Sequence, residues 1–212
     1  MYVLYYSPGA ASLVVHQALM ELGVRFELKR LDLDAGQQKS AAYLAINPAG
    51  LVPTLIVDNQ ACSEATALLI LLTERHHQPA LAPAPGTPDR PAFLQWMFFL
   101  ANTVQPQFRR WFYPGDWAPA EAEAETKDNA RQALEAAFTR LDDHLAGGGF
   151  MAGDYGVLDM HTTMLCRWSR NMPKPANRWP NIAAYLAKTT ARPSWIEVHR
   201  AEGLELWPPA KA

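Results

Sequence analysis

Residues 47–64, NPAGLVPTLIVDNQACSE, decide the fold. Residues 54–57 are typical of a β-strand, Asp-Asn-Gln follows as a tight turn, and residues 61–62 fit a short returning strand. Pro53 stands directly before the first strand, where its missing N–H removes no ladder hydrogen bond. The stretch therefore predicts a β-hairpin entered through a Val-Pro bend.

The chain upstream predicts a strand, a helix and a second strand. Residues 2–6, YVLYY, suit a pleated sheet, and apolar residues at 15, 18, 19 and 22 share one helical face. Residues 24–29 then alternate between apolar and charged types. A β-α-β crossover places its two strands parallel with a right-handed connection. The turn between the first strand and the helix is SPGAAS, residues 7–12.

Downstream, a leucine-rich helix opens at Ser63-Glu64 and runs to about Arg75. Prolines at 79, 83, 85, 88 and 91 then prevent both helix and sheet pairing, which is typical of a linker. The remaining patterns are helical, including a long helix with Pro106 as a kink and another with Pro180 at its first position. We therefore expect a small α/β domain followed by an all-α domain.

Composition indicates an ordinary soluble globular protein. Of 212 residues, 49% are hydrophobic and 19% charged, and the net charge of −2 gives no electrostatic case for nucleic acid or an acidic membrane surface. Cys62 and Cys166 form no metal-ligand or CxxC spacing, so we expect no metal, no disulfide and a cytoplasmic location. No targeting segment and no apolar run long enough for a membrane span is evident.

Five motifs together carry a resemblance to a known family: YYSPGAAS, NPAGLVPTL, SEATALLILL, GDYGVLDMH and ARPSW, in this order and spacing. The chain resembles the soluble glutathione transferases, and looks most similar to the bacterial (beta-like) branch whose first turn reads SPGAC. The resemblance implies a thioredoxin-like domain over 1–78, a Pro-rich linker over 79–90, and a helical domain over 91–212 that contributes a hydrophobic co-substrate pocket. It also implies a homodimer.

The resemblance further implies where glutathione binds. A cis peptide bond before Pro53 would turn the backbone of Val52 outward, beside Leu51, to pair with the tripeptide as a short added strand. Glu64 and Ala65 open a helix, whose free N–H groups suit the γ-glutamyl carboxylate, although Ala65 lacks the hydroxyl often found there. An ordinary N-cap role for Ser63 is the alternative. Gln38 and Lys39, with Gln37, are candidates for the glycyl carboxylate.

The catalytic group is left open by the sequence. The bacterial branch has a cysteine where this chain has Ala11, and a histidine where we align Gln105. Lowering a thiol pKa from about 8.5 by two units takes about 2.7 kcal/mol, more than the about 0.3–1 kcal/mol of a helix N-terminus. A side-chain donor is therefore expected: Ser12 first, then Tyr5, with Ser7 and Tyr6 as further alternatives. Ala11, Gln105 and Arg109 are expected to contribute to substrate binding, with Arg109 facing the co-substrate.

These features predict an enzyme, a glutathione S-transferase, in which the thiolate of glutathione attacks a hydrophobic electrophile. Glutathione is then a co-substrate, and no bound cofactor is needed. A glutathione-dependent isomerase or dehalogenase would share the first half of this mechanism. The main alternative is a non-catalytic protein that binds glutathione or a hydrophobic ligand. A thiol-disulfide reductase fits least, because the first turn contains no cysteine.

Overall fold

The computed structural model describes residues 1–77 and 80–208. Its internal contacts divide the chain into two units. The first unit joins Met1–Leu81 to Ala191–Leu206, and the second begins at Ala82 and runs through Thr190. The expected boundaries at 78, 79–90 and 91 stay predictions, and positions 78 and 79 lie outside the described residues. The last helix, which we expected in the helical domain, belongs to the first unit.

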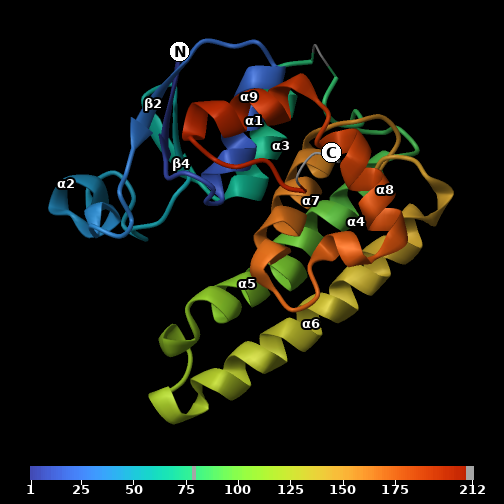
Figure 1. Ribbon diagram of the computed structural model, residues 1–212. Coiled ribbons are helices and arrows are strands. Elements are labelled where there is room, and N and C mark those ends of the chain that lie inside the picture. The colour runs from blue at the N-terminus through green and yellow to red at the C-terminus, as the bar shows by residue number, and fades with distance from the viewer. Residues whose placement is uncertain (78–79, 209–212) are drawn as a thin grey trace. The chain divides into compact units, whose positions relative to one another are not determined.

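The first unit is a sheet with helices (Figure 1). In chain order its elements are β1 (Tyr2–Tyr6), α1 (Ser12–Glu21), β2 (Phe26–Arg30), a 3-10 turn (Gln37–Lys39), α2 (Ala41–Leu44), β3 (Thr54–Val57), β4 (Gln60–Ser63), α3 (Ala65–Arg75) and α9 (Pro193–Glu202). The strand order is β2-β1-β3-β4. β1 and β2 pair in parallel, and the other two pairs are antiparallel. The predicted β-α-β crossover and hairpin are both confirmed.

The local chemistry of the turns explains these elements. Asp58 and Asn59 link β3 to β4 with φ of 50° and 65°, as a two-residue type I′ hairpin turn requires. Gly23, with φ of 63°, ends α1 at the position where a left-handed residue is favoured. Leu4 of β1 and Leu55 of β3 are fully buried, and α1 packs against α3 and α9. The core of this unit therefore lies on the α1 face of the sheet.

The second unit is built of helices among its described residues. They are α4 (Arg90–Phe99), a π-helical turn (Leu100–Val104), α5 (Gln105–Phe112), short 3-10 turns at Pro114–Asp116 and Ala120–Ala122, α6 (Glu123–His144), a 3-10 turn (Leu145–Gly147), α7 (Val157–Trp168), 3-10 turns at Ser169–Asn171 and Ala176–Arg178, and α8 (Pro180–Thr189). We predicted one kinked helix across Pro106. The structure has one continuous helical run over 90–112, with a π turn at Leu100–Val104 inside it, and Pro106, which has no N–H to donate, follows directly after that turn.

The start of α7 is organised by Asp159. Its carboxylate accepts hydrogen bonds from the N–H groups of Met151 at 2.9 Å and Gly156 at 3.0 Å. The hydroxyl of Tyr185, on α8, donates to the same group at 2.8 Å. Gly156 has no side chain, so only the Asp159 half of a capping box is present. This residue therefore ties α7, α8 and the preceding loop together.

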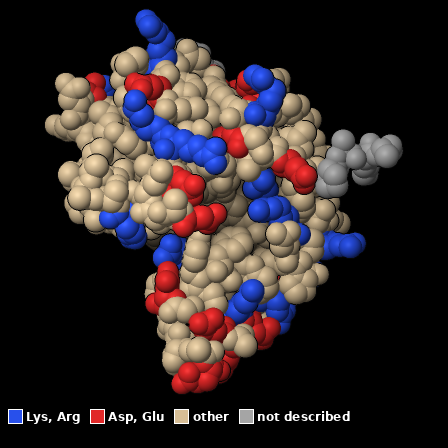
Figure 2. Space-filling model, turned by 60° about the vertical axis from the view of Figure 1, so that its left-hand side comes forward, with Lys and Arg blue, Asp and Glu red and all other residues tan. Residues whose placement is uncertain are grey.

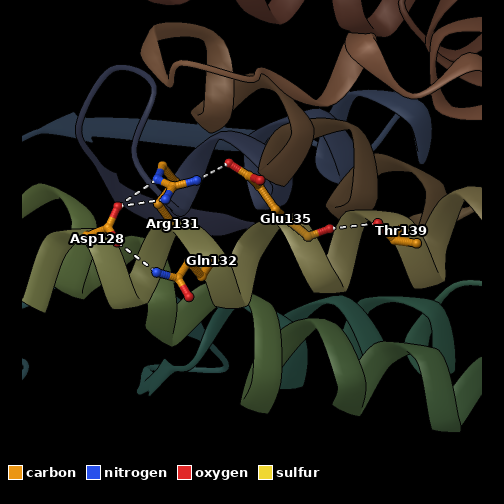
Figure 3. A network of polar contacts seen from close by, with 5 residues as sticks. All are labelled: Asp128, Arg131, Gln132, Glu135 and Thr139. Carbon is orange, nitrogen blue, oxygen red and sulfur yellow. Dashed lines mark hydrogen bonds and ion pairs between the residues drawn. The ribbon is translucent and has the colours of Figure 1, made fainter.

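Charged side chains lie mainly on the surface. On α6, Arg131 donates to Asp128 and Glu135, and Gln132 donates to Asp128 (Figure 3). Hydrogen bonding to Arg131 lowers the pKa of Asp128. Figure 2 shows basic and acidic groups interspersed over much of the face in view. Within residues 1–77 and 80–208, no helix is long and apolar enough to span a bilayer, and no cluster of three or more His, Cys, Asp or Glu could hold a metal.

Candidate functional site

Three predicted segments of the first unit converge at one end of the sheet. β1 runs antiparallel to β3 with Tyr5 opposite Thr54, and Thr54 is opposite Ser63 of β4. The end of β1, the start of β3 and the end of β4 therefore coincide. The turn at 7–12 follows β1, residues 51–53 precede β3, and residues 64–65 follow β4. The topology thus assembles most of the predicted binding residues.

The bend before β3 leaves Val52 with a free backbone edge. The Val52–Pro53 peptide bond is cis, as the resemblance implied. Neither the N–H nor the C=O of Val52 has a hydrogen-bond partner in the part of the chain that the structure describes. The preceding carbonyl, of Leu51, accepts from the Tyr43 hydroxyl at 2.6 Å and from Asn47 Nδ2 at 3.0 Å. An extended peptide has two backbone groups of Val52 to pair with.

Tyr43 and Asn47 support this bend, and sequence reasoning missed both. Each also bonds the Oγ1 of Thr54, at 2.7 Å and 2.9 Å respectively, and Thr54 is 1% exposed. Burial is the main cause that raises the pKa of Tyr43, so its hydroxyl stays protonated and donates to Leu51. The available signal was Asn47 at the head of the NPAG motif, since asparagine commonly bonds the backbone of a following turn.

Glu64 adopts a left-handed backbone conformation that residues other than glycine rarely take. Its φ is 69° and its ψ 104°, and its side chain is exposed. It is the N-cap of α3, so the alternative cap role for Ser63 is wrong. The N–H groups of Ala65 and Thr66 have no partner among the described residues, which leaves a helix N-terminus open to an anion. Strain of this kind is retained mainly at functional positions.

Gln38 and Lys39 lie beside the bend because Gly50 lets them approach. A Cβ at Gly50, whose φ is 60°, would lie 2.8 Å from the Gln38 carbonyl and 2.9 Å from Lys39 Nζ. Lys39 Nζ donates to the Ala49 carbonyl at 3.3 Å, and its side chain is exposed. Gln38 is half-buried and its Nε2 donates to the Leu33 carbonyl. Lys39 thus lies against the Ala49–Gly50 backbone, which leads into the bend at Leu51 and Val52.

The turn after β1 uses the hydroxyl of Ser12 for its own structure. The Ser12 side chain is fully buried, its Oγ donates to the Ser7 carbonyl at 3.1 Å, and it accepts from the Ser7 N–H at 3.2 Å. This conflicts with the predicted role of Ser12 as thiol donor, because its only proton is already donated. The backbone N–H groups of Ala11 and Ser12, in contrast, have no partner within the described ranges.

The other hydroxyl candidates differ in availability. Tyr5 is half-buried with its ring centroid 5.5 Å from that of Tyr43, and its hydroxyl has no partner among the residues described. Tyr6 is 8% exposed and its ring contacts that of His16. The Ser7 hydroxyl also lacks a partner in the described chain, and Ser7 is 8% exposed. Tyr5, Tyr6 and Ser7 therefore each carry a hydroxyl with no partner among the described residues, and Tyr5 is the least buried of the three.

Gln105 and Arg109 belong to the second unit. Gln105 begins α5 directly after the π turn, and its Oε1 accepts from His161 Nε2 at 3.0 Å. Arg109 donates to Asp116 at 2.6 Å, and its guanidinium lies 4.9 Å from the ring centroid of Tyr113. Both predicted residues therefore have partners inside their own unit, and their predicted roles toward a ligand stay predictions.

Known proteins are similar to the whole chain. The family described as Glutathione S-transferase, N-terminal domain, matches residues 1–71. Glutathione S-transferase GST-4.5 of Xanthomonas campestris pv. campestris is 30% identical over 205 residues, 95% of this chain and 98% of the relative.

Solved structures share the fold. A sphingomonad glutathione S-transferase complexed with glutathione has a TM-score of 0.84 at 30% identity and covers 96% of this chain and 100% of its own. A bacterial beta-class glutathione S-transferase of Sphingomonas chungbukensis has a TM-score of 0.85 at 30% identity, with the same coverage. The predicted thioredoxin-like domain with an all-α domain is confirmed. The chain belongs to the glutathione S-transferase family, as its motifs predicted.

Proposed function

We propose that this protein binds glutathione along the Val52 edge and promotes attack of its thiolate on a hydrophobic electrophile. One observation carries the proposal. The backbone of Val52 and the N–H groups of Ala11 and Ser12, all without partners among the described residues, lie at the same end of the sheet. A tripeptide paired with Val52 as a short added strand would bring its central cysteine toward the start of α1.

Hydrogen bonds from this turn are strong enough to lower the pKa of the glutathione thiol, although the turn contains no cysteine. Stabilising a thiolate by two pKa units requires about 2.7 kcal/mol. Each hydrogen bond to a charged group contributes about 1.5–3 kcal/mol, so the two free N–H groups of Ala11 and Ser12 reach this value together. The hydroxyl of Tyr5, or of Ser7, would supply a further donor. We therefore assign the side-chain contribution to Tyr5 ahead of Ser12.

The ends of the tripeptide have matching groups. The open N-terminus of α3, at Ala65 and Thr66, suits the carboxylate of the γ-glutamyl residue. Glu64, exposed beside it, suits the α-amino group. Lys39, with Gln38, suits the glycyl carboxylate. The relative solved with glutathione supports a ligand of this chemistry.

The chemical step needs no group beyond the two substrates. With a chloronitrobenzene, the thiol proton passes to water and a sulfur–carbon bond forms. The carbon–chlorine bond then breaks, and chloride leaves with the bonding pair. The protein contributes positioning and a lowered thiol pKa. Exposed aromatic side chains of the second unit, Phe112, Tyr113 and Trp117, are candidates to bind the electrophile.

The alternative is a protein of the same fold that binds glutathione or a hydrophobic ligand without turnover. It is favoured by Ala11, Ala65 and Gln105, which depart from the bacterial pattern. The same pocket chemistry would also serve a glutathione-dependent isomerase or dehalogenase. These functions differ from a transferase in the steps that come after attack by the thiolate.

Calorimetric titration with glutathione, followed by conjugation assays across electrophile classes, tests the proposal. We expect saturable binding and turnover, with Tyr5→Phe lowering kcat more than Ser12→Ala does. Binding without turnover of any electrophile would favour the alternative, and absence of binding would contradict both. A Ser12→Ala variant that folds normally but loses the thiolate absorbance of bound glutathione would return the donor role to Ser12.

We also propose a homodimer, as the family resemblance implies. Large apolar side chains such as Phe98 and Ile196 are 52% and 45% exposed, which leaves surface for a second copy. Light scattering across a dilution series should give twice the mass of the chain. Cys62 and Cys166 are both free thiols, in keeping with the cytoplasmic location that the composition predicts.

A further inference from the structure

The first turn of the first unit is held by a carboxylate from the far end of the chain. Glu202, the last residue of α9, accepts a hydrogen bond from the Gly9 N–H at 2.9 Å through Oε2. Its other oxygen, Oε1, lies 2.8 Å from His16 Nδ1 on α1. The side chains of Glu202 and His16 are both 0% exposed. A carboxyl group is thus placed in the core next to the turn at 7–12.

The pair is arranged as one acceptor between two donors. His16 Nε2 is buried without a partner in the described chain, so the contact of Nδ1 with Glu202 is the polar contact that holds the ring. The ring packs between Tyr6 and Phe26, with centroid distances of 5.9 Å and 5.5 Å. A buried carboxylate is retained only where its oxygens are hydrogen-bonded, and here Gly9 and His16 fill that role.

The bond to Gly9 selects one form of the turn. The Ala10 N–H donates to the Ser7 carbonyl, so Pro8 and Gly9 are the central residues of a β-turn, and the Gly9 φ of 71° fits type II. Type I would require a negative φ at Gly9 and would reverse the Pro8–Gly9 peptide. The Gly9 N–H would then point away from Glu202. The carboxylate therefore holds the turn in the form that leads into Ala11 and Ser12.

We propose that Glu202 is a positioning residue for the thiol site: it fixes the Pro8–Gly9 peptide and so aims the free N–H groups at the start of α1. This rests on the proposed function, since it assigns those N–H groups to the glutathione sulfur. Glu202 touches no substrate itself. Its effect passes through one backbone peptide of the turn.

If Glu202 had a purely structural role, it would only hold α9 against α1. The opposite end of α9 makes a contact that does only this. There Glu21 of α1 accepts from Arg192 at 3.2 Å and from the Ser194 hydroxyl at 2.6 Å. The Glu21 side chain is 13% exposed. Glu21→Ala is therefore a matched control, because it loosens α9 without touching the turn.

The test compares Glu202→Ala, Glu202→Gln and Glu21→Ala with the wild type. Three readouts are needed: kcat and KM for conjugation, the ultraviolet thiolate absorbance of bound glutathione against pH, and stability in urea. We expect Glu202→Ala to lower kcat about 10- to 100-fold, the penalty of a misplaced catalytic group, with the thiolate forming at higher pH. Glu202→Gln keeps an oxygen for Gly9 and can donate to His16 in its other tautomer, so it should restore most activity. Glu21→Ala should retain the wild-type thiolate.

Glu202→Ala leaves His16 buried without a partner, so His16→Phe/Glu202→Leu is the second variant. Replacing both partners by apolar groups removes the unsatisfied atoms while Gly9 still loses its acceptor. We expect it to be more stable than Glu202→Ala yet equally impaired. If neither variant folds, Gly9→Ala tests the same turn from outside α9, because a φ of 71° is strained for alanine.

Each outcome decides the inference. A folded variant lacking the Gly9 contact but with wild-type thiolate absorbance would overturn it, as would an equal loss in Glu21→Ala. If the wild type itself neither binds nor conjugates glutathione, the proposed function fails, and Glu202 then has no thiol site to position.

Discussion

Gln105 and His161 are joined by a hydrogen bond inside the helical unit, with His161 Nε2 3.0 Å from Gln105 Oε1. His161 is 0% exposed and Gln105 is half-buried. The imidazole donates to the amide oxygen, so the amide NH₂ of Gln105 is directed away from His161. The motifs align Gln105 with the position where the bacterial branch has a histidine. In this chain the imidazole comes from His161 on α7, which contacts the residue at that position instead of occupying it.

His161 should make stability depend on pH. Burial lowers its pKa to about 4 from an ordinary 6.5. Between these values the unfolded chain binds more protons, so the free energy of unfolding falls as pH drops from about 6.5 to about 4. The loss amounts to about 3 kcal/mol at about 1.36 kcal/mol per unit. Urea unfolding at pH 7 and pH 4.5 measures the difference in the free energy of unfolding between the two pH values. This difference should be smaller in His161→Gln than in the wild type. His77→Gln, at an exposed position, should keep the wild-type difference; equal differences in all three would refute this origin.

Removing the two anchors of the Leu51 carbonyl should weaken glutathione binding. Tyr43→Phe alone should have a small effect on KM, because Asn47 still donates to that carbonyl. Tyr43→Phe/Asn47→Ala frees it, and we expect KM for glutathione to rise about tenfold with kcat largely kept, equivalent to about 1.4 kcal/mol of binding. Steady-state kinetics measure both constants. A fall in kcat at unchanged KM would show that the bend serves the chemical step instead.

Gly50→Ala should lower the free energy of unfolding by more than the penalty of a positive φ alone. Gly50 has φ of 60° and a backbone oxygen 2.8 Å from where a Cβ would lie, whereas Gly36 has φ of 71° and nothing within 4 Å. Gly36→Ala should therefore lose only about 1 kcal/mol, the usual penalty of a left-handed alanine. Gly50→Ala should lose more and should also bind glutathione less tightly, since Gln38 and Lys39 must move. Urea unfolding and calorimetry check both effects, and matching results for the two variants would contradict the packing argument.

Asp159→Ala should be strongly destabilising. It removes the acceptor of three donors, from Met151, Gly156 and Tyr185. Buried donors left unpaired lose about 1–3 kcal/mol each, so the total should exceed about 3 kcal/mol. Urea unfolding measures the loss, with Asp154→Ala, at an exposed position nearby, as the control. A loss under about 1 kcal/mol would mean that water replaces the carboxylate.

Local patterns were enough for most of the fold. The alternation around Phe26, the Asp58-Asn59 turn and the proline-rich linker each follow from short-range chemistry. The π turn before Gln105 was not predictable, because apolar spacing does not distinguish a five-residue turn from an α-helical one over so short a stretch. Nor was the placement of α9 with the sheet, because that depends on contacts between distant parts of the chain.

The candidate site was predictable where it is made of backbone, at Val52 and Ala65, because motifs specify backbone geometry. It was less predictable where a side chain has several possible hydrogen-bond partners. Ser12 looked available in the sequence but bonds Ser7. Glu202 had no local signal at all, since its partner Gly9 lies 193 positions away.

The π turn at Leu100–Val104 has a consequence for how this helix tolerates insertions and deletions. Such a turn holds one residue more than an α-helical turn, so the helix carries a spare position. Deleting one residue there would let an uninterrupted α-helix form. Because the π turn absorbs the extra residue locally, Gln105 would keep its direction toward His161 after the deletion. Relatives one residue shorter at this point should accordingly have a continuous α-helix here, with the same side chains facing the rest of the bundle.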